Sequence, residues 1–286
     1  MTTPYQTSPP CVLRKVSEES SEAEAYCAGF ELKEWWCDGL ADNLIEWIID
    51  YALKSDELST LDHTNTYVRL KQAAVRVYTT PKYARRGEVA EIAAHAVCRK
   101  YFDTIPIAPR VNYLSASNDP IKAFDLAHVR YTETNDVELW LGEAKFYKDR
   151  VAAIKDAISS IQGHITKGFL TNEKLLLGPQ ISSDIPHSQK VKDLFSSEES
   201  LDTLFKNAVF PVLIAANSDA TSKHTEETKS YRKQVAAEMQ ELWKSLGSSG
   251  LGDKIRLFLI YVPLGDKDKL SSAFHKRLKG LQIQAS

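Results

Sequence analysis

The sequence has little cysteine, no long apolar run and no excess of charge of one sign. Its four cysteines, Cys11, Cys27, Cys37 and Cys98, form no Cys-x-x-Cys pair, which argues against a zinc site or a redox motif. The longest purely apolar run, residues 257–262, is far too short to cross a bilayer. Lys and Arg number 36 against 38 Asp and Glu, a net charge of −2. That balance excludes a strongly basic nucleic-acid-binding chain but leaves room for a local basic patch.

The 286 residues are 43% hydrophobic and 26% charged, values that are ordinary for a globular protein and exclude a disordered or fibrous one. We expect an N-terminal helical and mixed segment, residues 1–80, to pack on a core of residues 81–286 that carries a C-terminal α/β extension; one continuous domain is the alternative. The first residues hold no basic region followed by an apolar stretch, so we expect no signal peptide. We therefore expect reduced thiols, a cytoplasmic location and no membrane partner.

Hydrophobic periodicity predicts the order of the secondary-structure elements. Residues 1–25 indicate an irregular segment or an edge strand, residues 66–78 fit either a helix or a strand, and residues 167–206 are less regular. This order predicts an α/β (mixed α+β) fold in which helices flank a mixed, partly antiparallel sheet. The expected helices cover residues 40–51, 87–101, 149–165, 225–246 and 269–281, and the expected strands cover residues 110–114, 122–131, 137–146, 209–216 and 254–262.

Acidic and basic side chains that can carry chemistry lie on the hairpin predicted for residues 122–146. In a strand, positions i and i+2 share a face, so Glu143 and Lys145 point the same way. Asp125 lies on the antiparallel partner strand and can meet them in the right register. Glu91 lies on the preceding helix. Carboxylate oxygens are the ligands that Mg²⁺ prefers, so the set predicts a magnesium site.

A metal ion and a lysine in such a site would support phosphodiester hydrolysis. An ion held by Asp125 and Glu143 would polarise the phosphoryl oxygen and lower the pKa of a bound water. Lys145 would stabilise the charge that develops in the transition state. Glu91 would complete the metal shell or act as a base.

The Glu-x-Lys spacing alone is a weak signal. It occurs three times, at Glu31/Lys33, Glu143/Lys145 and Glu227/Lys229. Only Glu143/Lys145 falls in an alternating strand that follows a strand with its own carboxylate and a helix that bears glutamates. This context favours the 143/145 pair over the other two.

The ordered set of a helix glutamate, a strand aspartate, a Glu-x-Lys strand and a following helix resembles the core of the PD-(D/E)xK nucleases, which is restriction-endonuclease-like. Three blocks further resemble the HamA family, the nuclease subunits of the bacterial Hachiman anti-phage defence system. The blocks are Arg86-Gly-Glu-Val-Ala-Glu-Ile-Ala-Ala-His95, Phe124-Asp-Leu-Ala-His128 and Leu141-Gly-Glu-Ala-Lys-Phe-Tyr147.

The resemblance implies a Mg²⁺-dependent deoxyribonuclease, in which Mn²⁺ can substitute, that works as a heterodimer with a HamB-like superfamily 2 DNA helicase. It places metal ligands at Glu91, Asp125 and Glu143 and the catalytic lysine at Lys145. All four residues are therefore candidate catalytic residues. The sequence departs from the general nuclease pattern at Phe124, where a proline is usual.

Several neighbouring residues are candidates for secondary roles. Glu88 competes with Glu91 as the helix acid, although a position near a helix start also suits an acid for structural reasons. Gln162 and His128 are candidate accessory residues, with a surface glutamine and a hydrogen-bonding histidine as the alternatives. A basic cluster that can contact DNA phosphates precedes the glutamate helix and consists of Lys82, Arg85 and Arg86.

Two other functions remain open at the level of sequence. The chain can be a catalytically inactive adaptor or regulator of the helicase with the same fold, or a nuclease that acts on RNA. Because phosphate contacts supply most non-specific affinity, a nuclease of near-neutral charge would bind free DNA weakly. A helicase that already holds the strand could present it to the site.

Overall fold

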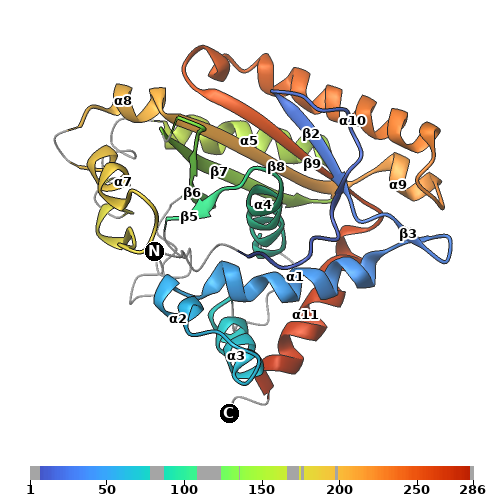
Figure 1. Cartoon of the computed structure of the whole chain (residues 1–286). Helices are drawn as coiled ribbons and strands as arrows, with labels where there is room; N and C mark the ends of the chain where they lie inside the picture. Colours follow the sequence, from blue (N-terminus) through green and yellow to red (C-terminus); the bar gives the residue numbers. More distant parts are fainter. Residues whose placement is uncertain are drawn as a thin grey trace.

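A seven-stranded mixed sheet with helices on both faces forms the centre of the computed structural model (Figure 1). The structure describes residues 7–77, 87–107, 124–134, 136–165, 174, 177–196 and 199–283. The strands are β1 Arg14–Lys15, β2 Ala23–Cys27, β3 Phe30–Glu31, β4 Glu34–Trp35, β5 Ile105–Pro106, β6 Leu126–Tyr131, β7 Val137–Tyr147, β8 Ala208–Asn217 and β9 Arg256–Leu264. The helices are α1 Cys37–Ala52, α2 Ser55–Ser59, α3 Thr66–Val77, α4 Glu88–Tyr101, α5 Arg150–His164, α7 Ser188–Leu194, α8 Leu201–Lys206, α9 Asp219–Lys223, α10 Lys229–Gly247 and α11 Lys267–Ile283, with short 3₁₀ helices η3 Gly178–Gln180 and η4 Leu251–Asp253.

Parallel strands occupy the middle of the sheet and antiparallel strands its edges. The order is β1-β2-β9-β8-β7-β6-β5. The pairs β2/β9, β9/β8 and β8/β7 are parallel, whereas β1/β2, β7/β6 and β6/β5 are antiparallel. A separate hairpin, β3–β4, follows β2. The predicted mixed α/β fold with a partly antiparallel sheet and flanking helices is therefore confirmed.

The side chains of β7 alternate between the two hydrophobic cores of the protein. Leu139 and Leu141 belong to the core that includes α5 and α10. Trp140, Ala144 and Phe146 belong to the core that includes α1, α3, α4 and α11. These two helix layers lie on opposite faces of the sheet (Figure 1). The alternation therefore directs odd-numbered residues of β7 toward α5 and even-numbered ones toward α4.

Most of the helices and strands predicted from the sequence are present. The antiparallel hairpin is confirmed as β6–β7 and the helix after it as α5, whose N-cap Asp149 accepts hydrogen bonds from two backbone N–H groups, as predicted. The ambiguous segment 66–78 forms α3 to residue 77, and the helix expected over residues 225–246 begins at Lys229, after the short α9. The strand expected at residues 110–114 lies outside the described residues.

The N-terminal segment differs from the irregular or edge strand expected for residues 1–25. Strand β2 lies inside the sheet between β1 and β9, and all five of its residues are buried. Buried Glu24 is compensated there by Lys15, 2.7 Å away, and by the hydroxyl of Tyr26. Residues before position 80 contribute strands β1 and β2 to the central sheet. The division at residue 80, with one continuous domain as its alternative, stays a prediction.

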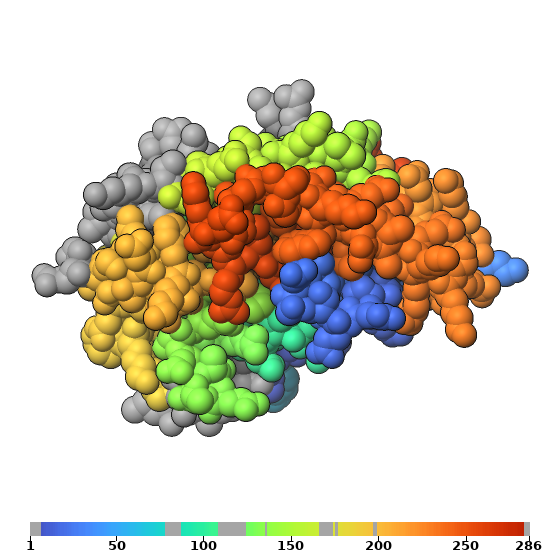
Figure 2. Space-filling view, turned by 90° about the horizontal axis from the view of Figure 1, so that it is seen from above, coloured from blue at the N-terminus to red at the C-terminus, as the bar shows by residue number. Residues whose placement is uncertain are grey.

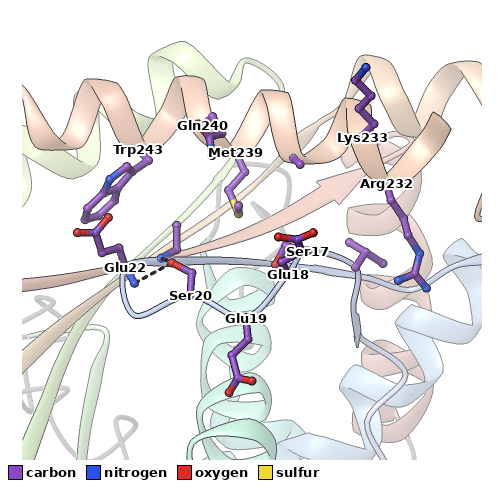
Figure 3. A pocket seen from close by; sticks show the side chains of 13 residues that line it. Ser17, Glu18, Glu19, Ser20, Glu22, Arg232, Lys233, Met239, Gln240 and Trp243 are labelled. Atoms are coloured by element: carbon purple, nitrogen blue, oxygen red, sulfur yellow. Dashed lines mark hydrogen bonds between the residues drawn. The ribbon is translucent and has the colours of Figure 1, made fainter. Parts of the chain in front are cut away.

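A hollow of about 670 Å³ lies between the turn before β2 and helix α10. Figure 2 shows the N-terminal segment in blue beside the orange surface of α10. In Figure 3 the side chains of Met239 and Trp243 point from α10 toward the turn that carries Glu22. None of the lining residues is among those predicted to carry chemistry. In the described part of the chain, no helix is long and apolar enough to cross a membrane.

Candidate active site

Glu143 and Lys145 form an ion pair on the face of β7 that α5 covers. Lys145 Nζ lies 2.9 Å from Glu143 Oε1, and the two side chains are 15% and 6% exposed. The alternation of side chains along a strand predicted that both residues share one face of the sheet. The structure confirms this prediction. Parallel β8 lies directly beside them, with Glu143 opposite Val212 and Lys145 opposite Ile214.

Helix α5 places a row of polar side chains against this pair. Asp156, Ser160 and His164 are spaced four residues apart, so they share one face of the helix. Asp156 Oδ2 lies 2.7 Å from Lys145 Nζ, and Ser160 Oγ donates a hydrogen bond of 2.8 Å to Glu143 Oε1. His164 Nδ1 lies 3.4 Å from Glu143 Oε2. We call Asp156, Ser160 and His164 the α5 row.

The α5 row was not predicted from the sequence, which pointed instead to Gln162. Gln162 lies on α5 but is exposed, about 200° around the helix from Ser160 on the 100° per residue of an α-helix. This position agrees with the alternative of a surface glutamine, and an accessory role for Gln162 stays a prediction. The signal that could have found the row is the recurrence of polar residues at every fourth position of a helix that directly follows the Glu-x-Lys strand.

Asp125 lies immediately before β6, next to the Glu143 strand. The antiparallel register pairs Leu126 with Gly142, and its continuation sets Asp125 opposite Glu143. Asp125 Oδ2 accepts a hydrogen bond of 2.9 Å from the backbone N–H of Ala144. The sequence predicted Asp125 on the first strand of the hairpin, whereas the structure places it one residue before that strand, beside the Glu143 strand.

Glu91 lies on α4, the helix that covers the opposite face of the sheet. Its side chain is buried, and Oε2 accepts a hydrogen bond of 2.7 Å from the hydroxyl of Tyr51 on α1. Glu88, the competing helix acid, lies in the same first turn of α4 and is half-buried. Within the described ranges, no three His, Cys, Asp or Glu side chains are close enough to hold a metal ion together. The metal-ligand roles of Glu91, Asp125 and Glu143 therefore stay predictions.

One carboxylate oxygen of the pair is nevertheless suited to a cation. Glu143 Oε2 is fully buried and accepts no hydrogen bond from any described residue. A buried carboxylate oxygen without a donor costs free energy, which a bound cation would offset. Hard divalent ions such as Mg²⁺ take oxygen ligands of this kind. Glu143 therefore fits the metal site predicted from the sequence.

The two carboxylates around Lys145 keep its ammonium group protonated. Burial alone would lower the pKa of Lys145, but the charges of Glu143 and Asp156 and their hydrogen bonds outweigh it and raise the pKa above its ordinary value. For Asp156, burial acts to raise the pKa, and hydrogen bonds from Lys145 and Tyr147 outweigh it, so that the pKa is lowered. At neutral pH the site thus holds a fixed positive charge between two carboxylates.

His128 belongs to a buried network on the α4 side of the sheet rather than to the Glu143 face. Its Nδ1 lies 2.7 Å from Thr104 Oγ1 and its Nε2 lies 3.1 Å from His95 Nδ1. His95 Nε2 in turn lies 2.6 Å from Asp50 Oδ1, which also pairs with Arg99. The even position of His128 in β6 directs it toward α4. Its contacts agree with the alternative of a hydrogen-bonding histidine, and an accessory role at the site stays a prediction.

The basic cluster predicted to contact DNA lies outside the described residues. It comprises Lys82, Arg85 and Arg86, in the segment that precedes α4. Its role in DNA binding stays a prediction.

Comparison with known proteins identifies the family of the chain. The HamA family profile matches residues 10–278, which is nearly the whole sequence and includes both the Glu143–Lys145 pair and the α5 row. No curated protein matches the sequence. The chain belongs to the HamA family.

Proposed function

We propose that this chain is a metal-dependent deoxyribonuclease that acts with a helicase in Hachiman anti-phage defence. Membership of the HamA family connects the chain with that defence system. The observation that supports the reaction type is the ion pair of Glu143 and Lys145, which are 2.9 Å apart, with one buried carboxylate oxygen left without a hydrogen bond. A carboxylate oxygen open to a cation beside a protonated lysine supports cation-assisted phosphodiester hydrolysis.

Each residue of the pair has a separate role in the proposed reaction. Glu143 would hold Mg²⁺, or Mn²⁺ in its place, through Oε2, with Asp125, immediately before the neighbouring strand β6, as the second carboxylate. When bound, the ion supplies Lewis-acid polarisation of the phosphoryl group and a more acidic water. Lys145, held protonated, would direct an N–H toward the phosphate and stabilise the negative charge that builds up on its oxygens.

The proposed partner is a HamB-like superfamily 2 helicase. The chain carries a net charge of −2, so its affinity for free DNA phosphates is expected to be low. A helicase that already holds the strand would raise the effective DNA concentration at the site. We therefore expect cleavage to depend on the helicase and on salt concentration.

The test is cleavage of plasmid DNA by the purified chain with Mg²⁺, with and without the helicase and ATP. We expect cleavage with the helicase present and none after chelation of the metal. A matched RNA strand in the same assay distinguishes a ribonuclease, because hydrolysis that requires the 2′-OH would appear on RNA alone. If the wild-type chain cuts neither DNA nor RNA while it still binds the helicase, the proposal is refuted and the adaptor function replaces it.

A further inference from the structure

We propose that Asp156 and Ser160 on α5 are positioning residues that preset the Glu143–Lys145 pair. Ser160 donates to one oxygen of Glu143, which leaves Oε2 for a divalent cation. Asp156 accepts one N–H of Lys145, which leaves another N–H for the substrate phosphate. The inference rests on the proposed nuclease function and deepens it, because neither residue was assigned a role there.

The two carboxylate oxygens of Glu143 differ in the hydrogen bonds that they accept. Oε1 accepts from Ser160 Oγ at 2.8 Å and from Lys145 Nζ at 2.9 Å. One carboxylate oxygen offers about two lone-pair sites, so Oε1 is saturated. Oε2 accepts no hydrogen bond from the described residues, and His164 Nδ1 lies 3.4 Å from it. The carboxylate is thus fixed in rotation by its inner oxygen, and Oε2 is the atom left for a cation.

The three N–H donors of the Lys145 ammonium group also have different partners. An ammonium group has three N–H donors. Glu143 Oε1 at 2.9 Å and Asp156 Oδ2 at 2.7 Å are the acceptors of two of them. Asp156 is itself held by the hydroxyl of Tyr147, which donates a hydrogen bond of 2.9 Å to the same Oδ2. This arrangement leaves one N–H of Lys145 for a substrate.

Helix α5 is held in place at its N-terminus and along its buried side, so it can fix the positions of Asp156 and Ser160. Its N-terminus is capped by Asp149, whose carboxylate accepts from the N–H groups of Val151 and Ala152 at 2.7 and 3.1 Å. The side opposite the solvent packs into the core through Ala153, Ile154, Ala157 and Ile161. Side chains on such a rigid element hold a site more precisely than side chains on a loop.

The two positioning residues should affect different quantities. Among the described residues, the Ser160 hydroxyl bonds to the carboxylate of Glu143. Loss of this hydroxyl should therefore free Glu143 to rotate and weaken cation binding. Asp156 contacts the ammonium group of Lys145 and the hydroxyl of Tyr147, and within the described part of the chain no hydrogen bond or ion pair joins it to Glu143. Its replacement by Asn should therefore misplace Lys145 and slow cleavage without changing cation affinity. Loss of residues that orient metal ligands typically reduces affinity or activity by about 10- to 100-fold.

The experiment measures Mn²⁺ affinity by isothermal titration of the full chain, and the cleavage rate in the presence of the helicase. We expect S160A to weaken Mn²⁺ binding about 10-fold or more, and S160T, which keeps the hydroxyl, to restore it. S159A is the matched control, because Ser159 is the exposed neighbour on the same helix. We expect D156N to lower kcat about 10-fold or more with Mn²⁺ affinity within about twofold of wild type, and exposed D253N to change neither quantity.

The outcomes separate this inference from the proposed function. If wild type binds Mn²⁺ and cleaves while S160A and D156N behave as S159A and D253N do, the positioning roles are refuted and the nuclease function stands. If wild type neither binds Mn²⁺ nor cleaves, both fail together. A purely structural role would lower the melting temperature of S160A and D156N but leave Mn²⁺ affinity and kcat unchanged below that temperature, and that result also overturns the inference.

Discussion

Removal of the Asp50 carboxylate should destabilise the protein far more than removal of an exposed carboxylate on the same helix. Asp50 is 7% exposed, and Arg99, its partner on α4, is 6% exposed. Asp50 Oδ1 lies 3.0 Å from Arg99 Nε and 2.6 Å from His95 Nε2. In the variant Asp50→Ala, the buried guanidinium group of Arg99 would lose its hydrogen bonds to this carboxylate and the negative charge that the carboxylate supplies.

An uncompensated buried charge of this kind costs about 3–5 kcal/mol. For a chain of this size we expect a fall in melting temperature of roughly 6–20 °C, at about 2–4 °C per kcal/mol. The assay is thermal unfolding followed by tryptophan fluorescence. The matched control is Asp42→Ala on the same helix α1, where the carboxylate is 64% exposed and pairs with Arg277. An exposed pair contributes about 1 kcal/mol or less, so the control should melt close to wild type.

A double variant tests the physical cause. Asp50→Leu combined with Arg99→Met removes both charges and fills the space with apolar groups, so it should lose less stability than Asp50→Ala alone. Melting of Asp50→Ala within about 2 °C of Asp42→Ala would show that the buried charge is not the cause.

Three further predictions concern stability. Burial lowers the pKa of His95 and His128 below the ordinary 6.5, so the unfolded chain binds more protons there and stability should fall as the pH drops below about 6.5, measured by urea titration across pH. Replacing the turn residues Leu32 and Lys33, which have φ of 49° and 64°, by Asn and Gly should relieve backbone strain and raise stability by about 1–2 kcal/mol; an unchanged or lower unfolding midpoint would contradict this. Gly142→Ala should cost about 1–3 kcal/mol, because the new Cβ would lie 2.9 Å from a side-chain atom of β8; a melting temperature equal to wild type would contradict it.

The parts of the fold that depend on local pattern could be predicted from the sequence. The alternation in residues 137–146 and the capping Asp149 were enough for β7 and α5. The same period of two put Glu143 and Lys145 on one face, and the structure confirms their contact. These features need no knowledge of which elements pack together.

The features that depend on packing could not be predicted. Sequence order does not say which face of the sheet a helix covers, and so Glu91 and His128 were grouped with Glu143 although α4 lies on the other face. Ser160 and His164 look like ordinary polar helix residues until α5 is laid against β7. Residues 1–25 were predicted to be irregular or an edge strand, because the sequence alone does not show that the charge of buried Glu24 on β2 is paired with Lys15.

The most direct test of the central claim is DNA cleavage by two matched double variants in the presence of the helicase, ATP and Mg²⁺. One variant, Glu143→Ala with Lys145→Ala, removes the proposed catalytic pair. The other, Glu31→Ala with Lys33→Ala, removes the same spacing from the exposed β3–β4 hairpin. We predict that the first abolishes cleavage while it keeps its helicase binding and circular dichroism spectrum, and that the second cuts as wild type does. Equal cleavage by both variants would contradict the assignment of the active site.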